Sequence, residues 1–91
     1  MSETKKILVV EDDLVTQRML SARLEITGYD VITASDGEEA LNKARKENPD
    51  LLILDLMLPK MTGYEVCRML KFDDKYKKIP IIIFVVTGPA G

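Results

Sequence analysis

A single acid follows one apolar run and three acids follow another, and these residue types indicate metal or phosphate chemistry. Residues 51–54 read Leu-Leu-Ile-Leu and are followed at once by Asp55. Residues 7–10 form a similar run, followed by three acids at 11–13. Two unit charges about 4 Å apart repel by about 4 kcal/mol at an effective dielectric near 20, so a fold that gathers carboxylates needs a reason. Mg²⁺ is the simplest one, because it binds carboxylates, and a carboxylate beside it can attack phosphorus as a nucleophile.

The elements that must position these acids alternate between strands and helices. Short apolar runs predict strands, and apolar residues spaced by three and four between capping signals predict helices. Such alternation predicts an α/β domain with a parallel sheet and helices on both faces. Ligands of such sheets bind outside the carboxyl ends of the strands, where the acids would meet if the first and third strands are neighbours. The predicted strands are about 6–11, 30–34, 50–55 and 80–86, and the predicted helices are about 14–27, 37–47 and 63–71.

Three finer predictions concern packing. Four apolar residues of the first helix recur at spacings of four and three, which predicts one apolar face: Val15, Met19, Ala22 and Ile26. Cys67 is predicted to be a small core residue of the third helix. The segment 75–78, Lys-Tyr-Lys-Lys, is predicted to be a solvated loop.

Composition excludes several classes of function. The 91 residues carry 13 basic and 15 acidic side chains, a net charge of −2 that gives no support to nucleic-acid or anionic-membrane binding. No run approaches the roughly 18 apolar residues of a membrane span. The polar N-terminus has no secretory signal, so we expect a cytoplasmic protein. With one cysteine and no histidine, an internal disulfide and a histidine-based zinc site are both excluded.

Four sequence stretches resemble the receiver domain of two-component response regulators. They are LVVEDD (8–13), DGEEAL (36–41), NPD (48–50) and LLILDLMLPKMTG (51–63). The resemblance extends from residue 5 to about residue 84. The acids at 11–13 and the motif that begins at Asp55 are each weak evidence for this family alone. Together, and both at the ends of apolar runs, they are specific evidence for it.

The resemblance implies a fold, a cofactor and partners. The fold would be a three-layer, flavodoxin-like parallel sheet with strand order 2-1-3-4. Asp55 would accept a phosphoryl group from a histidine kinase or phosphotransfer protein, which would dock mainly against the first helix. Mg²⁺ would be held by Asp12 and Asp55, by Glu11 acting mostly through water, and by the backbone carbonyl of Met57. The domain would be a signalling module and not an enzyme in the usual sense.

From Val85 onward the sequence departs from the family pattern. Val85 stands where the family carries its switch Ser or Thr, and Thr87, two residues later, is the candidate substitute. After its fourth strand the family has a further helix, a strand that ends in a Lys, and a last helix, and this sequence has no counterpart of them. We therefore expect a single truncated receiver domain over 1–91, with impaired switching and output. The strand at 80–86 and one sheet face would then be uncovered, which predicts a homo-oligomer.

Two other functions fit the same residues less well. The chain could be an interaction or assembly module that oligomerises through its uncovered sheet and is never phosphorylated. It could also be a phosphatase with an Asp nucleophile, but those carry Asp-x-Asp at a strand end, and Met57 stands where the second acid is required.

Overall fold

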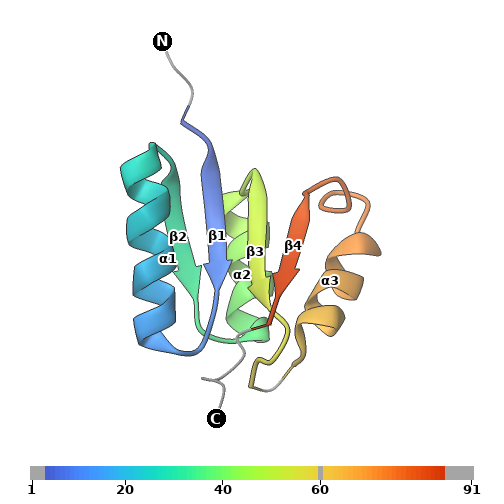
Figure 1. The fold of residues 1–91 in the computed structure, drawn as a ribbon. Coiled ribbons are helices and arrows are strands. Elements are labelled where there is room, and N and C mark those ends of the chain that lie inside the picture. Colours follow the sequence, from blue (N-terminus) through green and yellow to red (C-terminus); the bar gives the residue numbers. More distant parts are fainter. Residues whose placement is uncertain (1–3, 60, 86–91) are drawn as a thin grey trace.

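The computed structural model describes residues 4–59 and 61–85, in which strands and helices alternate along the chain (Figure 1). Among these residues no helix has both the length and the apolar character that crossing a bilayer requires. The elements are β1 (Lys6–Val10), α1 (Leu14–Thr27), β2 (Asp30–Ala34), α2 (Gly37–Glu47), β3 (Leu51–Asp55), α3 (Gly63–Lys71) and β4 (Ile81–Phe84).

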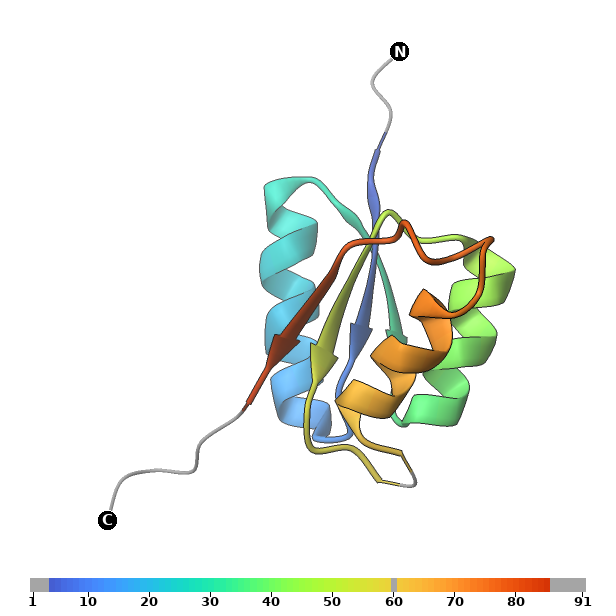
Figure 2. The same cartoon turned by 90° about the vertical axis from the view of Figure 1, so that its right-hand side faces the viewer.

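The four strands form one parallel sheet in the order β2-β1-β3-β4. α1 covers one face of this sheet, and α2 and α3 cover the other (Figure 2). The predicted three-layer arrangement and strand order are therefore confirmed. β1 ends at Val10, one residue earlier than expected, and β4 begins at Ile81, because Pro80 has no N–H to donate to the ladder.

The main core lies between the sheet and the α2–α3 layer. Side chains alternate across a pleated strand, so Leu8, Val10, Leu52 and Leu54 point to the same face, and all four are fully buried. They pack against residues of α2 and α3 that are also buried: Ala40, Leu41, Ala44, Val66 and Leu70. Each buried leucine contributes about 1.5–3 kcal/mol, so this layer holds β1 and β3 rigidly side by side.

Tyr76 also belongs to this core, although the segment 75–78 was predicted to be solvated. Only 6% of Tyr76 is exposed, and its hydroxyl donates to the backbone carbonyl of Arg45 at 3.2 Å. The three lysines around it are exposed, which is why the segment reads as polar. Cys67 is half-buried, so it lies at the margin of the core and not within it.

α1 is rotated relative to the apolar face predicted for it. Val15, Met19 and Ile26 are 67%, 60% and 87% exposed, so that prediction was wrong. Gln17 is the buried residue of the helix. The face toward the sheet is only half apolar and comprises Gln17, Leu20, Ser21 and Leu24. Polar contacts in the first turn fix this rotation, and they are described with the site below.

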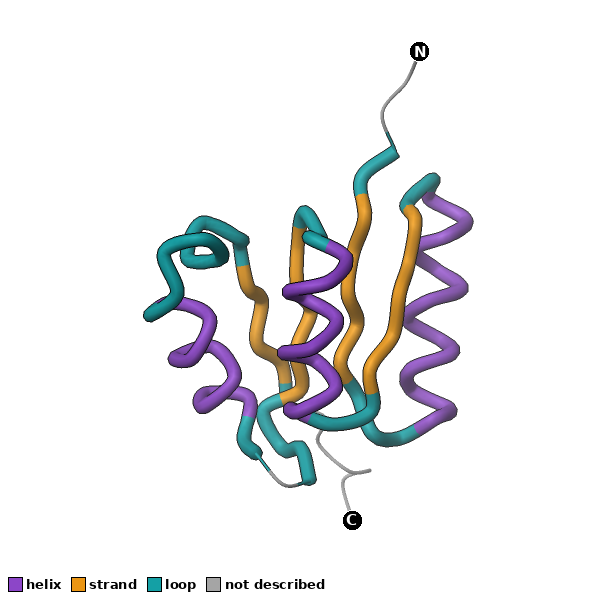
Figure 3. Tube along the Cα trace, turned by 180° about the vertical axis from the view of Figure 1, so that it is seen from behind, coloured by secondary structure: helices purple, strands orange, loops and turns teal. Residues whose placement is uncertain are grey.

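Each helix begins with a side chain that caps its first turn. Asp13, Asp36 and Thr62 accept the backbone N–H of the residue three positions on, at 3.0, 2.8 and 3.2 Å. α1 ends at Thr27 and is capped by Gly28, whose φ of 111° is costly for any residue with a Cβ. Because each helix follows a strand of the parallel sheet, all three helix N-termini lie at the carboxyl edge of the sheet, next to the loops that follow the strands (Figure 3).

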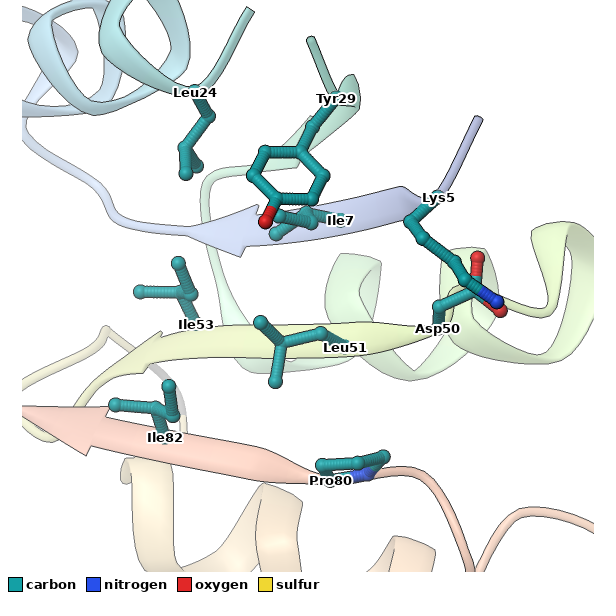
Figure 4. A pocket seen from close by; sticks show the side chains of 9 residues that line it. All are labelled: Lys5, Ile7, Leu24, Tyr29, Asp50, Leu51, Ile53, Pro80 and Ile82. Atoms are coloured by element: carbon teal, nitrogen blue, oxygen red, sulfur yellow. The ribbon is translucent and has the colours of Figure 1, made fainter. Parts of the chain in front are cut away.

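A groove runs along the sheet face on the α1 side (Figure 4). Its volume is about 570 Å³. Apolar side chains of β1, β3 and β4 form its floor, and Leu24 and Tyr29 stand at one wall. The strand residues that line it are Ile7, Leu51, Ile53 and Ile82. α1 therefore leaves part of this face uncovered.

Candidate functional site

Three carboxylates converge at the carboxyl edge of the sheet. One carboxylate oxygen each from Glu11, Asp12 and Asp55 lies within 4.8 Å of the others. Glu11 and Asp55 are buried, with 1% and 4% exposed, whereas Asp12 is exposed to solvent. The structure thus brings together the three acids that the sequence singled out, as a half-buried cluster open on one side.

The parallel pairing of β1 with β3 produces this convergence. Val10 pairs with Leu54 in the register, so the residues that follow them, Glu11 and Asp55, leave the sheet side by side. Both strands are held by the buried core described above, and each acid follows a fully buried residue. Asp55 therefore projects from a rigid strand end and not from a mobile loop.

Backbone N–H groups orient two of the acids. The N–H of Asp12 donates to Oε2 of Glu11 at 2.9 Å, and the N–H of Met57 donates to Oδ1 of Asp55 at 3.1 Å. Each carboxylate is thereby fixed by the chain next to it. The bond from Asp12 favours the charged form of Glu11 and offsets part of the repulsion within the cluster.

Burial and the neighbouring acid control the ionisation of Glu11. Burial, together with a hydrogen bond to Asp55 and its negative charge, raises the pKa of Glu11 from 4.5 to about 8. The metal-free cluster therefore keeps a proton on Glu11 at neutral pH, which relieves the repulsion between the two buried acids. A bound cation could take the place of this proton.

The N-terminus of α3 packs directly on the strand end that carries Asp55. The N–H of Gly63 donates to the carbonyl of Leu56 at 2.9 Å. A Cβ on Gly63 would lie 2.7 Å from the backbone oxygen of Asp55, which is closer than real Cβ contacts allow. Only glycine permits this approach, so Gly63 helps to fix the backbone of Asp55.

One further residue of the site was missed by the sequence reasoning. Nε2 of Gln17 donates to the carbonyls of Glu11 at 2.8 Å and Ala34 at 3.2 Å, and so bridges the ends of β1 and β2. A signal was present in the sequence, because Leu20 and Leu24 lie three and seven residues after Gln17 and define a helical face that contains it. The exposed apolar residues of α1 hid that face.

The structure gives less information on the other residues that were predicted to belong to the site. Met57 follows Asp55 by two residues with an exposed side chain, and the ligand role of its carbonyl stays a prediction. Thr87 lies outside the residues that the structure describes. Phe84 pairs with Asp55 in the register and Val85 follows it, so the described end of β4 offers no hydroxyl beside the acids.

The donor set of the cluster suits a hard divalent cation. The three side chains provide only oxygen ligands, and the exposed Asp12 leaves room for water and for phosphate oxygens. Mg²⁺ prefers this combination, whereas zinc sites usually include nitrogen or sulfur. The residues present therefore fit Mg²⁺.

Comparison with known proteins gives a consistent match. The family model of the response regulator receiver domain matches residues 7–90. The chain is 49% identical over 84 residues to a probable transcriptional regulator, ycf27, of Cyanophora paradoxa, covering 92% of this chain and 34% of that protein. It is 61% identical over 67 residues to the alkaline phosphatase synthesis transcriptional regulatory protein PhoP of Bacillus subtilis, covering 74% and 28% respectively.

A solved structure has a closely similar fold. The response regulator TrrA of Thermotoga maritima, crystallised in complex with Mg²⁺ and BeF, superposes with a TM-score of 0.86 at 38% identity, covering 93% of this chain and 72% of that one. The chain spans about a third of the length of the curated relatives named above.

Proposed function

Because the chain belongs to the response regulator receiver domain family, we propose that it accepts a phosphoryl group on Asp55 in a cytoplasmic two-component relay. The convergence of Glu11, Asp12 and Asp55 within 4.8 Å carries this proposal. Asp55 is suited to the acceptor role because it stands at the end of the central strand β3, with its backbone fixed by α3. The complex of the similar protein TrrA with Mg²⁺ and BeF supports the same assignment.

The acids of the cluster would also hold Mg²⁺. Asp12 and Asp55 would be its direct side-chain ligands, Glu11 would act mostly through water, and the carbonyl of Met57 would be a further ligand. When bound, the cation supplies positive charge that offsets the carboxylates and the oxygens of the incoming phosphoryl group. The proton on Glu11 would leave as the cation binds.

The transfer itself needs only positioning and a nucleophile. A carboxylate oxygen of Asp55 forms the new O–P bond while the P–N bond of a phosphohistidine breaks, and the imidazole nitrogen keeps the bonding electron pair. The donor would be a histidine kinase or phosphotransfer protein. α1 begins two residues after Asp12, and Leu14 and Val15 in its first turn are 55% and 67% exposed, which provides an apolar docking surface beside the acids.

Switching after phosphorylation should be weak in this polypeptide. Phosphorylation adds about −1.5 to −2 charge, which a receiver reads by drawing a hydrogen-bond donor toward it. Phe84 and Val85 at the end of β4 have no such side-chain donor. We therefore expect transfer without strong rearrangement of β4.

Labelling with acetyl phosphate tests the acceptor role. Intact-mass spectrometry should show one added phosphoryl group with Mg²⁺ and none with EDTA, and peptide mapping should place it on Asp55. Labelling should be slower than in receivers that carry a Ser or Thr at the end of this strand, because Phe84 and Val85, the described residues there, have no hydroxyl to meet the phosphoryl oxygens. Asp55→Asn should remove it, and Asp13→Asn, which changes an acid outside the cluster, should retain it. A label on another residue would contradict the proposal.

The groove and the open edge of β4 favour a second candidate function, self-assembly. Among the described residues β4 pairs only with β3, its sequence Ile81–Phe84 carries no charge, and Ile82 is 52% exposed. An uncharged edge strand can pair antiparallel with its own copy about a twofold axis, so a second copy of this chain is the proposed occupant. The charges that would block such pairing are absent from β4 itself.

Sedimentation velocity over a hundredfold concentration range tests the assembly. The 91-residue polypeptide should form dimers, and Ile82→Lys should make it monomeric, because the lysine would be buried in the pair. Ile26→Lys, which makes the same change at a side chain of α1 that is 87% exposed, is the matched control. A wild-type monomer at the highest concentration would exclude this candidate and leave the phosphoacceptor role unaffected.

A further inference from the structure

Gln17 has an unusual position for a glutamine in a surface helix. It is only 8% exposed, and it is the residue of α1 that is buried, whereas the apolar residues Val15, Met19 and Ile26 face solvent. Burying an amide costs free energy unless its hydrogen-bonding groups find partners. The hydrogen-bond partners of the Gln17 amide therefore indicate why this side chain is buried.

The amide nitrogen donates to two strand ends at once. Its partners are the carbonyls of Glu11, at 2.8 Å, and Ala34, at 3.2 Å. Carbonyl oxygens only accept hydrogen bonds, so the NH₂ group and not the amide oxygen must face them. The carbonyl of Ala34 also accepts the N–H of Glu11 at 3.0 Å, which joins β1, β2 and α1 at one point.

These contacts fix a single peptide plane, the one between Glu11 and Asp12. Its carbonyl accepts from Gln17, and its N–H donates to the carboxylate of Glu11 at 2.9 Å. Both polar groups of the plane are thus held, one by the helix and one by the acid. The orientation of this plane decides where the exposed carboxylate of Asp12 projects relative to Asp55.

The helix is tied to the same loop at a second point. Asp13 caps α1 through the N–H of Thr16 at 3.0 Å, and the carbonyl of Asp13 accepts the N–H of Gln17 at 2.9 Å. Residues 11–13 therefore have little freedom to rotate.

From this geometry we propose that Gln17 is a positioning residue of the acidic site. It holds the Glu11–Asp12 peptide plane so that Asp12 and Glu11 face the same cation as Asp55. The inference rests on the proposed Mg²⁺ site. It assigns to Gln17 no contact with the cation or the phosphoryl group. Residues that orient ligands in this way commonly change metal affinity by 10- to 100-fold when they are removed.

Replacement of Gln17 by methionine tests the role. Gln17→Met keeps the length and volume of the side chain but has no donor. Calorimetric titration should show Mg²⁺ affinity about tenfold weaker than in wild type, at a temperature where the variant is fully folded. Ser21→Ala, one turn later on the same face of α1, is the matched control and should bind Mg²⁺ like wild type. Asp12→Asn is the reference for loss of a ligand.

A second readout needs no metal. In EDTA, the N–H of Asp12 should exchange with solvent about tenfold faster in Gln17→Met than in wild type, because its peptide plane is freed. A general loss of stability would instead raise exchange across the β1 amides, and Ser21→Ala should change neither.

The possible results distinguish a failure of the positioning role of Gln17 from a failure of the proposed phosphoacceptor function. If wild type binds Mg²⁺ and Gln17→Met binds it within twofold of wild type, the positioning role is wrong and the phosphoacceptor proposal stands. Unchanged exchange at Asp12 would also overturn it. If wild type binds no Mg²⁺, and Asp12→Asn therefore changes nothing, the site assignment fails and the positioning role fails with it.

Discussion

The buried carboxyl of Glu11 lies beside the carboxylate of Asp55, and this proximity makes the metal-free site dependent on pH. Burial and the neighbouring charge raise the pKa of Glu11 from 4.5 to about 8. Glu11 keeps its proton at neutral pH, and the two acids are neighbours because the ends of β1 and β3 are adjacent.

We expect the metal-free protein to lose stability as pH rises. Between about pH 4.5 and 8 the unfolded chain releases the Glu11 proton while the folded chain retains it. The unfolded state therefore binds fewer protons, so the free energy of unfolding falls with pH, on the order of a few kcal/mol in total. Urea unfolding in EDTA at several pH values measures this.

Glu11→Gln is the control for this pH dependence. The variant has no titrating group at that position, so its free energy of unfolding should vary much less between pH 5 and 8, roughly the window set by the shifted pKa. Hydrogen bonds lower the pKa values of Asp13 and Glu39 from 3.8 and 4.5, so both acids titrate below this window. An equally steep decline in Glu11→Gln would show that another group is responsible.

Gly63→Ala should damage both stability and the site. The added Cβ would lie 2.7 Å from the backbone oxygen of Asp55 and 2.9 Å from Cα of Leu56, so the strand end must move. We expect a loss of about 1–3 kcal/mol in the free energy of unfolding, together with weaker Mg²⁺ binding. Chemical denaturation and calorimetric titration measure the two effects.

Gly28→Ala provides the comparison for Gly63→Ala. Gly28 has open space around it, but its φ of 111° makes a Cβ costly, by about 1–2 kcal/mol. It lies at the end of α1, away from the acids, so Mg²⁺ affinity should be unchanged. Equal losses of affinity in the two glycine variants would mean that affinity follows stability and not the local contact.

Tyr76→Phe should show that the segment 75–78 is part of the core. The variant removes the donor to the carbonyl of Arg45, and we expect a loss of about 1 kcal/mol in thermal or urea unfolding. Tyr76→Ala should cost about 3–5 kcal/mol. Tyr64→Phe, at a position 63% exposed, should stay within about 0.5 kcal/mol of wild type. A Tyr76→Ala protein as stable as wild type would place this side chain outside the core.

The fold and the acidic cluster could be predicted because strong local signals agree with them. Four apolar runs define the strands, and caps such as Asp36 and Thr62 mark where helices begin. Strand order follows from the resemblance, and with it the meeting of Asp12 and Asp55. Each strand is marked by the burial of its apolar side chains, and each helix start by a side chain that hydrogen-bonds the free backbone N–H groups of the first turn.

The rotation of α1 and the burial of Tyr76 could not be predicted in this way. The apolar residues of α1 occupy more than one face, so periodicity does not determine which face packs on the sheet. The buried face is selected by hydrogen bonds from Gln17 to the carbonyls of Glu11 and Ala34, and the helical spacing of Gln17, Leu20 and Leu24 is only a weak local sign of it. Tyr76 likewise points into the core because its hydroxyl donates to the carbonyl of Arg45, which is 31 residues away in the sequence.

The most direct test of the phosphoacceptor site is binding of beryllofluoride, an analogue of the phosphoryl group, followed by ¹⁹F NMR. Wild type should give bound-state resonances only when Mg²⁺ is present, and Asp55→Asn should give none under the same conditions. Bound resonances that persist in EDTA or in Asp55→Asn, or their absence from wild type with Mg²⁺, would contradict the account.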